Sequence, residues 1–163
     1  MIVRITDELL DSLLEKARSS PRKRFMHTLH SGAWEHAHRM LNAFTAGSYG
    51  RPHRHLNPHK SEGFVILRGR VAVVAFDGSG NLDFQQTTIL EAGSSTVGAD
   101  IGPNTWHTLV AFQDSVLYEV KGQPDEGYDP NTDKEFPDWA PEEGTEGAPA
   151  YLEQLKSQSL SRA

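Results

Sequence analysis

Two histidines in the segment Arg51-Pro52-His53-Arg54-His55 have the type and spacing of metal ligands. Side chains two residues apart lie on the same face of an extended strand, so His53 and His55 are expected to point in one direction. Two imidazoles on one face form half of a metal site. Glu62 and the more distant His107 can supply the other half. The chemistry expected of this part of the chain is therefore the binding of a divalent metal.

The histidines belong to a longer pattern that includes glycine and proline. In order, the chain has Gly47, five residues, His53, one residue, His55, six residues, Glu62, six residues and Gly69. This pattern resembles the first sequence motif of the cupin superfamily, in which the gap before the glutamate is shorter. Residues 101–107, Ile-Gly-Pro-Asn-Thr-Trp-His, resemble the second motif, a proline-led loop followed by a histidine. Asn104 stands where many cupins have glycine, and asparagine tolerates the left-handed backbone angles of a tight turn.

Other segments are similar to the WbuC-type cupin metalloproteins, and the resemblance covers nearly the whole chain. The segments are Arg51–His55, residues 60–70, Glu119-Val120-Lys121-Gly122, Asp133-Lys134-Glu135-Phe136 and Trp139-Ala140-Pro141. Members of that group are associated with gene clusters for O-antigen and other surface polysaccharides. The resemblance implies an all-β cupin fold, a double-stranded β-helix or jelly roll, with a metal in its mouth. By motif position the ligands would be His53, His55, Glu62 and His107.

This ligand set has a definite chemistry. Three neutral imidazoles and one carboxylate suit Fe(II), Mn(II), Ni(II), Co(II) or Zn(II), and they leave one or two positions for water or substrate. One divalent transition metal is therefore the expected cofactor. His59, which lies in the lengthened gap between His55 and Glu62, can replace or supplement a ligand. We expect it at the pocket rim or in solvent, because Glu62 keeps the motif's spacing to Gly69.

Several further residues are candidates for contact with a substrate. Arg51 shares the parity of His53, and an arginine there would favour a carboxylate or phosphate on the substrate. Trp106 either packs in the core or forms a wall that stacks on a sugar. Isomerisation or epimerisation needs a base near the substrate, and the candidates for that catalytic role are Glu62, His59 and Tyr49.

The sequence predicts a β-rich body with two flanking segments. Leu9, Leu10, Leu13, Leu14 and Ala17 give an apolar stripe over a helix at 7–17, which Thr6 can cap. Strands are expected near 38–46, 52–56, 62–68, 70–77, 82–90, 95–101, 105–112 and 115–121. The expected divisions are an N-terminal helical or extended segment at 1–30, a cupin barrel at 31–122 and a C-terminal extension at 123–163 packed on the barrel. That extension is rich in proline and acidic residues, and 151–156 can form a short closing helix.

Composition limits the partners. Residues 1–120 carry 12 acidic and 12 basic side chains, whereas residues 121–163 carry 10 and 4, so the net charge of −6 lies in the tail. This distribution does not resemble a nucleic-acid-binding surface. No apolar run is long enough to cross a bilayer, no signal-peptide pattern is present, and cysteine is absent. We expect a cytoplasmic homodimer that binds neither nucleic acid nor membrane.

Three functions remain open. The first is a metal-dependent enzyme, of the isomerase or epimerase kind, acting on a small sugar-like or other polar substrate in surface-polysaccharide metabolism. The second is an Fe(II)-dependent cupin oxygenase that uses the same ligands. The third is a non-enzymatic accessory protein that binds metal or sugar. An open metal face beside a concave polar cavity would favour catalysis.

Overall fold

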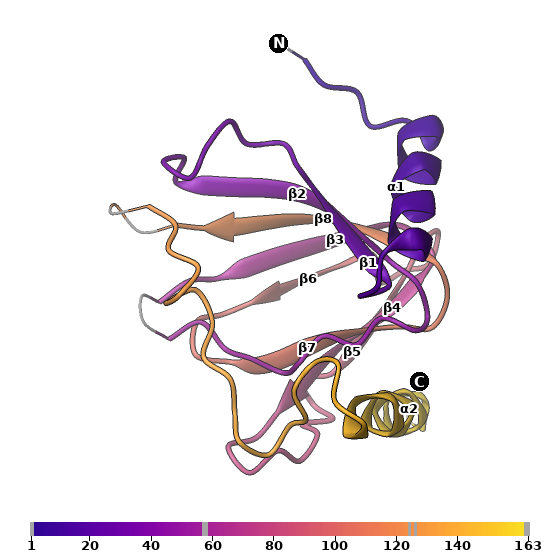
Figure 1. Ribbon diagram of the computed structural model, residues 1–163, viewed down its shortest axis with the longest axis vertical. Coiled ribbons are helices and arrows are strands. Elements are labelled where there is room, and N and C mark those ends of the chain that lie inside the picture. The colour runs from indigo at the N-terminus through magenta and orange to yellow at the C-terminus, as the bar shows by residue number, and fades with distance from the viewer. Residues whose placement is uncertain (1, 57–58, 124, 126, 162–163) are drawn as a thin grey trace.

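The strands of the computed structural model, which describes residues 2–56, 59–123, 125 and 127–161, form two facing sheets (Figure 1). The elements are α1 (Asp7–Ser19), β1 (Arg24–Thr28), β2 (Ala37–Phe44), β3 (Glu62–Arg68), β4 (Arg70–Phe76), β5 (Thr88–Glu91), β6 (Gly98–Ile101), β7 (Trp106–Ala111), β8 (Ser115–Gly122) and α2 (Gly147–Leu160). One sheet has the order β1-β2-β8-β3-β6 and the other β5-β4-β7. All neighbouring strands are antiparallel. The expectation of a mostly β sandwich is confirmed.

Each helix covers the outer face of one sheet. On the five-stranded sheet, Leu41 and Val116 pack against the apolar stripe of α1. On the three-stranded sheet, Val74 and Val110 pack against α2 together with Leu155. Thr6 caps α1 as expected, accepting a hydrogen bond from the backbone N–H of Leu9. The closing helix begins at Gly147 and ends at Leu160, so it is longer than the six residues expected.

The space between the sheets has an apolar end and a polar end. At the apolar end, Ile66 of β3 meets Val71 of β4 and Leu117 of β8. Along β8 the inward-facing side chains then change to Glu119 and Lys121, both less than a tenth exposed. Side chains alternate between the two faces of a strand, so these charged groups lie in the same row as Leu117. The polar end holds the candidate site.

Three expected strands are shorter than the sequence pattern indicated, including the strand expected at 95–101, of which only β6 is regular. The carboxylate of Asp83 accepts hydrogen bonds from the next turn of backbone, so the strand expected at 82–90 is regular only from Thr88 to Glu91. The segment 52–56 pairs only at isolated bridges. A further strand, β1, lies within the segment 1–30, which was expected to be helical or extended, and is one of the two edge strands of the larger sheet.

The chain after β8 crosses the open end of the sandwich before it reaches α2, and Figure 1 shows it in orange. Arg54 and Glu135 exchange two backbone hydrogen bonds of 3.0 Å along this path. The Tyr49 hydroxyl donates to the Pro141 carbonyl at 2.8 Å. The extension therefore closes the end of the sandwich at which the charged side chains face inward. Among the described residues, neither helix has the length and apolar content that a bilayer crossing requires.

Candidate metal centre

The structure brings together the four residues that the sequence motifs single out. One possible ligand atom from each of His53, His55, Glu62 and His107 lies within 4.8 Å of all the others. Glu62 is the first residue of β3 and His107 the second residue of β7, so the two facing sheets both contribute. His53 and His55 come from the segment that precedes β3. All except His53 are fully buried.

Backbone pairing positions two of the imidazoles directly. His53 and His107 form an antiparallel bridge in which the two residues exchange hydrogen bonds of 3.0 and 2.9 Å. Their rings are consequently adjacent, with centroids 4.6 Å apart. The loop before His107 turns at Asn104, whose φ is 63°, as predicted for the residue that stands in place of glycine. Its N–H donates to the carbonyl of His55 at 2.9 Å, which holds the third histidine against the same loop.

The outer nitrogen of each histidine faces a backbone carbonyl. Nδ1 of His53 lies 3.2 Å from the carbonyl oxygen of Arg51, and Nδ1 of His107 lies 2.8 Å from that of Thr105. Nδ1 of His55 contacts the carbonyl of Asp133 in the same way. A carbonyl only accepts, so each Nδ1 must carry the proton. In a neutral ring, Nε2 then presents a lone pair, which is the arrangement that orients metal-binding imidazoles in proteins.

Acceptor atoms therefore meet at the centre of the cluster. Glu62 places one carboxylate oxygen 2.7 Å from Nε2 of His55 and the other 3.3 Å from Nε2 of His107. Two acceptors at such distances repel unless a proton or a metal ion lies between them. Burial opposes ionisation of Glu62, but the facing imidazoles hold its pKa well below the ordinary value. Burial also lowers the pKa of His53, which favours the neutral ring that a metal needs.

The donor set fits a divalent transition metal. Nε2 of His55 is buried and has no hydrogen-bond partner among the described residues. Three imidazoles and an ionised carboxylate are the ligands that such ions take. His53, His55, Glu62 and His107 would hold the ion, and the structure does not choose among the candidate metals.

Three of the four cluster residues, His53, Glu62 and His107, line a cavity of about 400 Å³ between the sheets. On the five-stranded sheet, Glu119 and Asn42 line the same cavity and are hydrogen-bonded to each other. Burial, together with the negative charge of Glu62, raises the pKa of Glu119 to about 7. A carboxyl group with such a pKa can hold or release a proton near neutral pH.

A buried ion-pair network borders the cavity. The carboxylate of Asp133 accepts from Lys60 at 2.8 Å and from Lys121 at 2.9 Å, and Lys121 also lies 3.7 Å from Glu62. Burial opposes the ionisation of Asp133, but the two ammonium groups lower its pKa. Because the carbonyl of Asp133 also holds His55, the network ties the C-terminal extension to a candidate ligand.

The other residues predicted for the site are not all brought to it. Arg51 lines the cavity, where its guanidinium donates to the Pro137 carbonyl at 2.8 Å. Trp106 points to the opposite side of β7 from His107 and packs against Trp139 and Arg54. Trp106, His59 and Tyr49 are not among the described residues that line the cavity.

His59 and Tyr49 lie elsewhere. His59 is exposed and forms a bridge with Leu56 at the surface, outside the described ligand cluster. The ring of Tyr49 packs beneath α2, near Tyr151, and burial raises the pKa of its hydroxyl above the ordinary value, which disfavours a role as a base. Of the three catalytic candidates, only Glu62 faces the cavity.

The sequence analysis did not assign site roles to seven described charged residues of the cavity wall: Arg22, Arg24, Glu119, Lys121, Asp133, Lys134 and Glu143. A signal for two of them was present in β8, where Glu119 and Lys121 share the parity of Leu117. Charges in the row of a buried leucine indicate an inward-facing polar site. Asp133 and Lys134 lie on the extension, where no periodic pattern indicates which side chain points inward.

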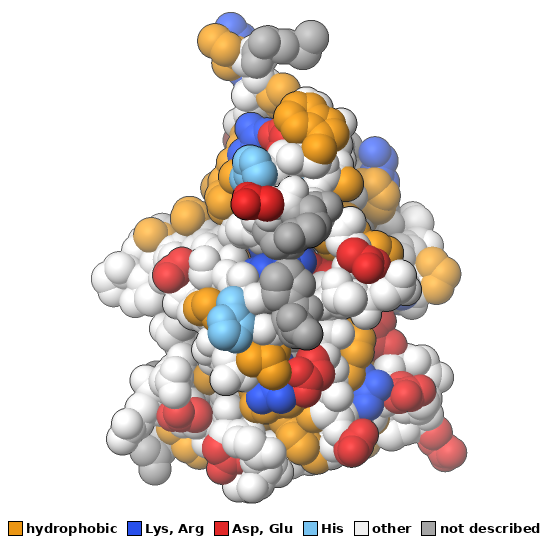
Figure 2. All heavy atoms as spheres, turned by 90° about the vertical axis from the view of Figure 1, so that its left-hand side faces the viewer, with side chains coloured by type: hydrophobic (Ala, Val, Ile, Leu, Met, Phe, Trp, Pro, Cys, Tyr) orange, Lys and Arg blue, Asp and Glu red, His pale blue; other side chains and the backbone are white. Residues whose placement is uncertain are grey.

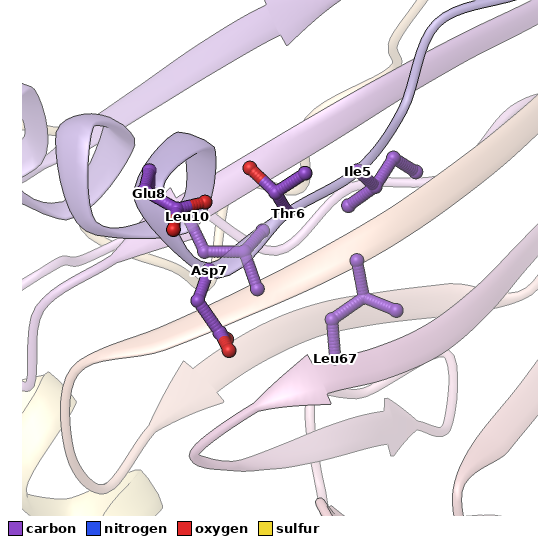
Figure 3. Close-up of a pocket in the computed structure, with 6 residues that line it drawn as sticks. All are labelled: Ile5, Thr6, Asp7, Glu8, Leu10 and Leu67. Carbon is purple, nitrogen blue, oxygen red and sulfur yellow. The ribbon is translucent and has the colours of Figure 1, made fainter.

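The surface around the cavity carries side chains of both charge signs. Figure 2 shows the end of the molecule that the extension crosses, with acidic, basic and hydrophobic side chains interspersed. A second, more open hollow of about 440 Å³ lies outside the sheets at the start of α1 (Figure 3). Its lining of Ile5, Thr6, Asp7, Glu8, Leu10 and Leu67 includes none of the candidate ligands.

Solved structures share the fold at low sequence identity. A structure of CapF with the inhibitor 3-isopropenyl-tropolone matches with a TM-score of 0.54 and 16% identity, over 68% of this chain and 31% of that one. This chain thus spans under a third of CapF. Oxalate oxidase in complex with glycolate matches with a TM-score of 0.52 and 16% identity, over 89% and 76% of the two chains. A cupin superfamily protein from Desulfitobacterium hafniense gives a TM-score of 0.46 and 14% identity, over 61% and 76%. No curated protein sequence matches.

The two antiparallel sheets, with a His₃Glu cluster at one open end, define the chain as a protein of the cupin fold. Residues 5–89, about half of the chain, match the model of a family described as a domain of unknown function, DUF6016. The chain belongs to the DUF6016 family. The matched region includes His53, His55 and Glu62.

Proposed function

We propose that this cupin is a divalent-metal-dependent enzyme that acts on a small polar, sugar-like molecule. The observation that carries the proposal is the position of the ligand cluster, which lines a cavity rather than lying in a closed core. Small-molecule sites typically have volumes of about 300–1,000 Å³, so the cavity of about 400 Å³ suits a compact substrate. A purely structural metal would be enclosed by its ligands.

The chain's own residues supply the remaining parts of an active site. A bound metal would act as a Lewis acid toward a carbonyl or hydroxyl of the substrate. Glu119 lies on β8, next to β3 in the five-stranded sheet; Asn42 donates a hydrogen bond to its carboxyl group, which can hold or accept a proton at neutral pH. Glu119 therefore replaces His59 and Tyr49 as the candidate acid–base residue. The extension crosses this end of the sandwich, next to the cavity.

More specifically, the proposal is that this enzyme is a WbuC-type protein and acts in surface-polysaccharide metabolism of the O-antigen type. Its support is the resemblance of the motif segments, including residues 133–136, which the structure places beside the cavity. The fold neighbours support only the fold. A cytoplasmic homodimer belongs to the same proposal.

The test begins with metal content and continues with activity. The purified protein is loaded anaerobically with Fe(II), Mn(II), Ni(II), Co(II) or Zn(II), and its metal stoichiometry is measured. Each form is then incubated with sugar phosphates, nucleotide sugars and sugar acids, and products are followed by NMR. Turnover that requires the metal and is lost in Glu119→Gln supports the proposal. A fully loaded protein that converts no member of the panel contradicts it.

An oxygen electrode separates the oxygenase alternative in the same experiment. Oxygen uptake that requires both Fe(II) and substrate would assign the site to oxygenase chemistry. Full activity of the Zn(II) form would exclude that alternative, since Zn(II) has no redox chemistry. Binding of a sugar without conversion in any metal form would instead favour the accessory protein.

A further inference from the structure

Lys134 differs from every other described cation of the cavity wall in having no anionic partner. Arg22 and Arg24 both pair with Glu143. Arg51 pairs with Glu142, and Lys121 pairs with Asp133. Among the described residues, the Lys134 ammonium makes no hydrogen bond and no ion pair. The Asp133 carboxylate next to it in sequence is already taken by Lys60 and Lys121.

The backbone on both sides of Lys134 is fixed. The carbonyl of Asp133 contacts Nδ1 of His55, and Glu135 is held by its two backbone hydrogen bonds with Arg54. Lys134 therefore enters the cavity from a position that the ligand segment itself determines. Binding groups on such fixed backbone lose less entropy when they bind a ligand.

Lys134 faces the cavity with an exposed side chain. It lines the same cavity as three of the four candidate metal ligands. Neighbouring protein atoms lower the pKa of Lys134, while the negative charge of Glu62 opposes that effect. An anion bound in the cavity would meet an ammonium that no described carboxylate occupies, and such a contact would be charge-assisted.

The charge of the loaded cavity favours an anion. Five described cations line the cavity (Arg22, Arg24, Arg51, Lys121 and Lys134), against the carboxylates of Glu62, Asp133, Glu143 and Glu119, so a bound divalent ion leaves a positive balance. The cavity remains positive even when Glu119 is ionised. We propose that Lys134 is the anion-binding residue of this cavity, and that the ligand is a small sugar-like molecule carrying a carboxylate or a phosphate. The inference rests on the proposed metal-dependent function and specifies the substrate class for the same site.

The test measures binding, not activity, on the zinc-loaded full chain. The probes are glucuronate, glucose 1-phosphate and neutral glucose, titrated calorimetrically at millimolar concentrations. Lys134→Gln removes the charge, and Lys156→Gln is the matched control, because Lys156 pairs with Glu153 on α2 away from the cavity. We expect the wild type and the control to bind at least one anion more tightly than glucose. Loss of one charge-assisted contact should weaken that binding about tenfold to a hundredfold in Lys134→Gln.

The two anionic probes distinguish the source of the charge, since preference for glucuronate indicates a sugar acid and preference for glucose 1-phosphate a sugar phosphate. The melting temperature and the Co(II) absorption spectrum of Lys134→Gln should match those of the wild type, because the side chain has no described structural partner. Anion binding that is unchanged in Lys134→Gln overturns the inference, as does a zinc-loaded wild type that binds neither anion or binds glucose equally well.

The zinc stoichiometry shows whether a negative result refutes the anion site or the proposed metal-dependent function. A protein that takes up no zinc, yet binds an anion through Lys134, would refute the metal-dependent function and retain the anion site. A protein that takes up zinc, with no effect of Lys134→Gln, would refute the anion site alone.

Discussion

Oε1 of Glu62 lies 2.7 Å from Nε2 of His55, although the contact between His55 Nδ1 and the carbonyl of Asp133 leaves that Nε2 a lone pair in the neutral ring. A proton or a metal ion must lie between the two atoms for the contact to be stable. At neutral pH a divalent metal fills this role without charging a buried imidazole. Metal uptake should consequently depend on each of the four clustered residues.

Replacement of His107 by asparagine should abolish tight metal binding. His107 is a candidate ligand from β7, and its loss should cost more than the roughly 10–100-fold typical of an outer-shell partner. His59→Asn is the matched control, because His59 is exposed and lies outside the cluster. Metal stoichiometry after anaerobic loading and desalting measures both. Equal metal loss in His59→Asn would assign a ligand role to His59 and contradict the four-residue site.

Glu119→Gln should become more stable than the wild type as the pH rises. The pKa of Glu119 is raised from 4.5 to about 7 in the folded protein. Between these values the unfolded chain loses the proton while the folded chain keeps it, so ionisation of Glu119 progressively destabilises the fold. The gain of the variant should therefore grow from about pH 4.5 to about pH 7, by at most on the order of 3 kcal/mol.

Urea unfolding of the metal-free proteins near pH 5 and near pH 8 measures this difference. Glu153→Gln, on the exposed face of α2, controls for the general loss of a carboxylate. A stability difference between Glu119→Gln and the wild type that stays constant over this range would show that Glu119 does not titrate as described.

Asp133→Asn should destabilise the fold strongly. The substitution leaves the buried ammonium groups of Lys60 and Lys121 without their shared carboxylate. Removing one partner of a buried ion pair costs about 3–5 kcal/mol. Glu135→Gln removes the neighbouring but half-exposed partner of Arg54, which should cost about 1 kcal/mol or less. If chemical denaturation shows equal losses of stability in the two variants, the buried network contributes no more to stability than the exposed pair does.

Gly69→Ala should also destabilise the protein, through the turn between β3 and β4. Gly69 has a φ of 85°, and an added Cβ would lie 2.5 Å from the carbonyl oxygen of Asp114. Left-handed backbone disfavours alanine, and the contact adds steric strain, so a loss of more than 1 kcal/mol is expected. Gly78→Ala, where a Cβ meets nothing within 4 Å, should be nearly neutral. Thermal unfolding of both variants checks the contrast.

The core of the fold and the ligand cluster could be predicted because both depend on short-range patterns. The expected strand at 62–68 coincides with β3, and the alternation in it places Glu62 on the same inward face as Phe64 and Ile66. The glycine and proline markers of the two motifs fixed the register of His53 and His107. A backbone bridge between those two residues then brings them together.

The remaining features depend on contacts between distant parts of the chain. β1 has a mixed sequence, and it becomes a strand because residues 24–28 pair with β2. The inward direction of Lys134 depends on the pairing of Glu135 with Arg54, 81 residues earlier. Trp106 was a candidate for stacking on a sugar, but α2 and the extension bring Trp139 to its ring. No local pattern carries such information.

The carbonyl of Asp133, which contacts the imidazole of His55, has a consequence for when metal can bind while the chain is being synthesised. The ribosome makes the four candidate ligands before it reaches this carbonyl, because the last of them is His107. Until residue 133 leaves the exit tunnel, the ring of His55 lacks the contact that fixes its proton on Nδ1. A nascent chain that ends near Gly122 has every ligand but no fixed orientation for one of them. Tight metal binding should therefore require residue 133 in addition to the four ligands.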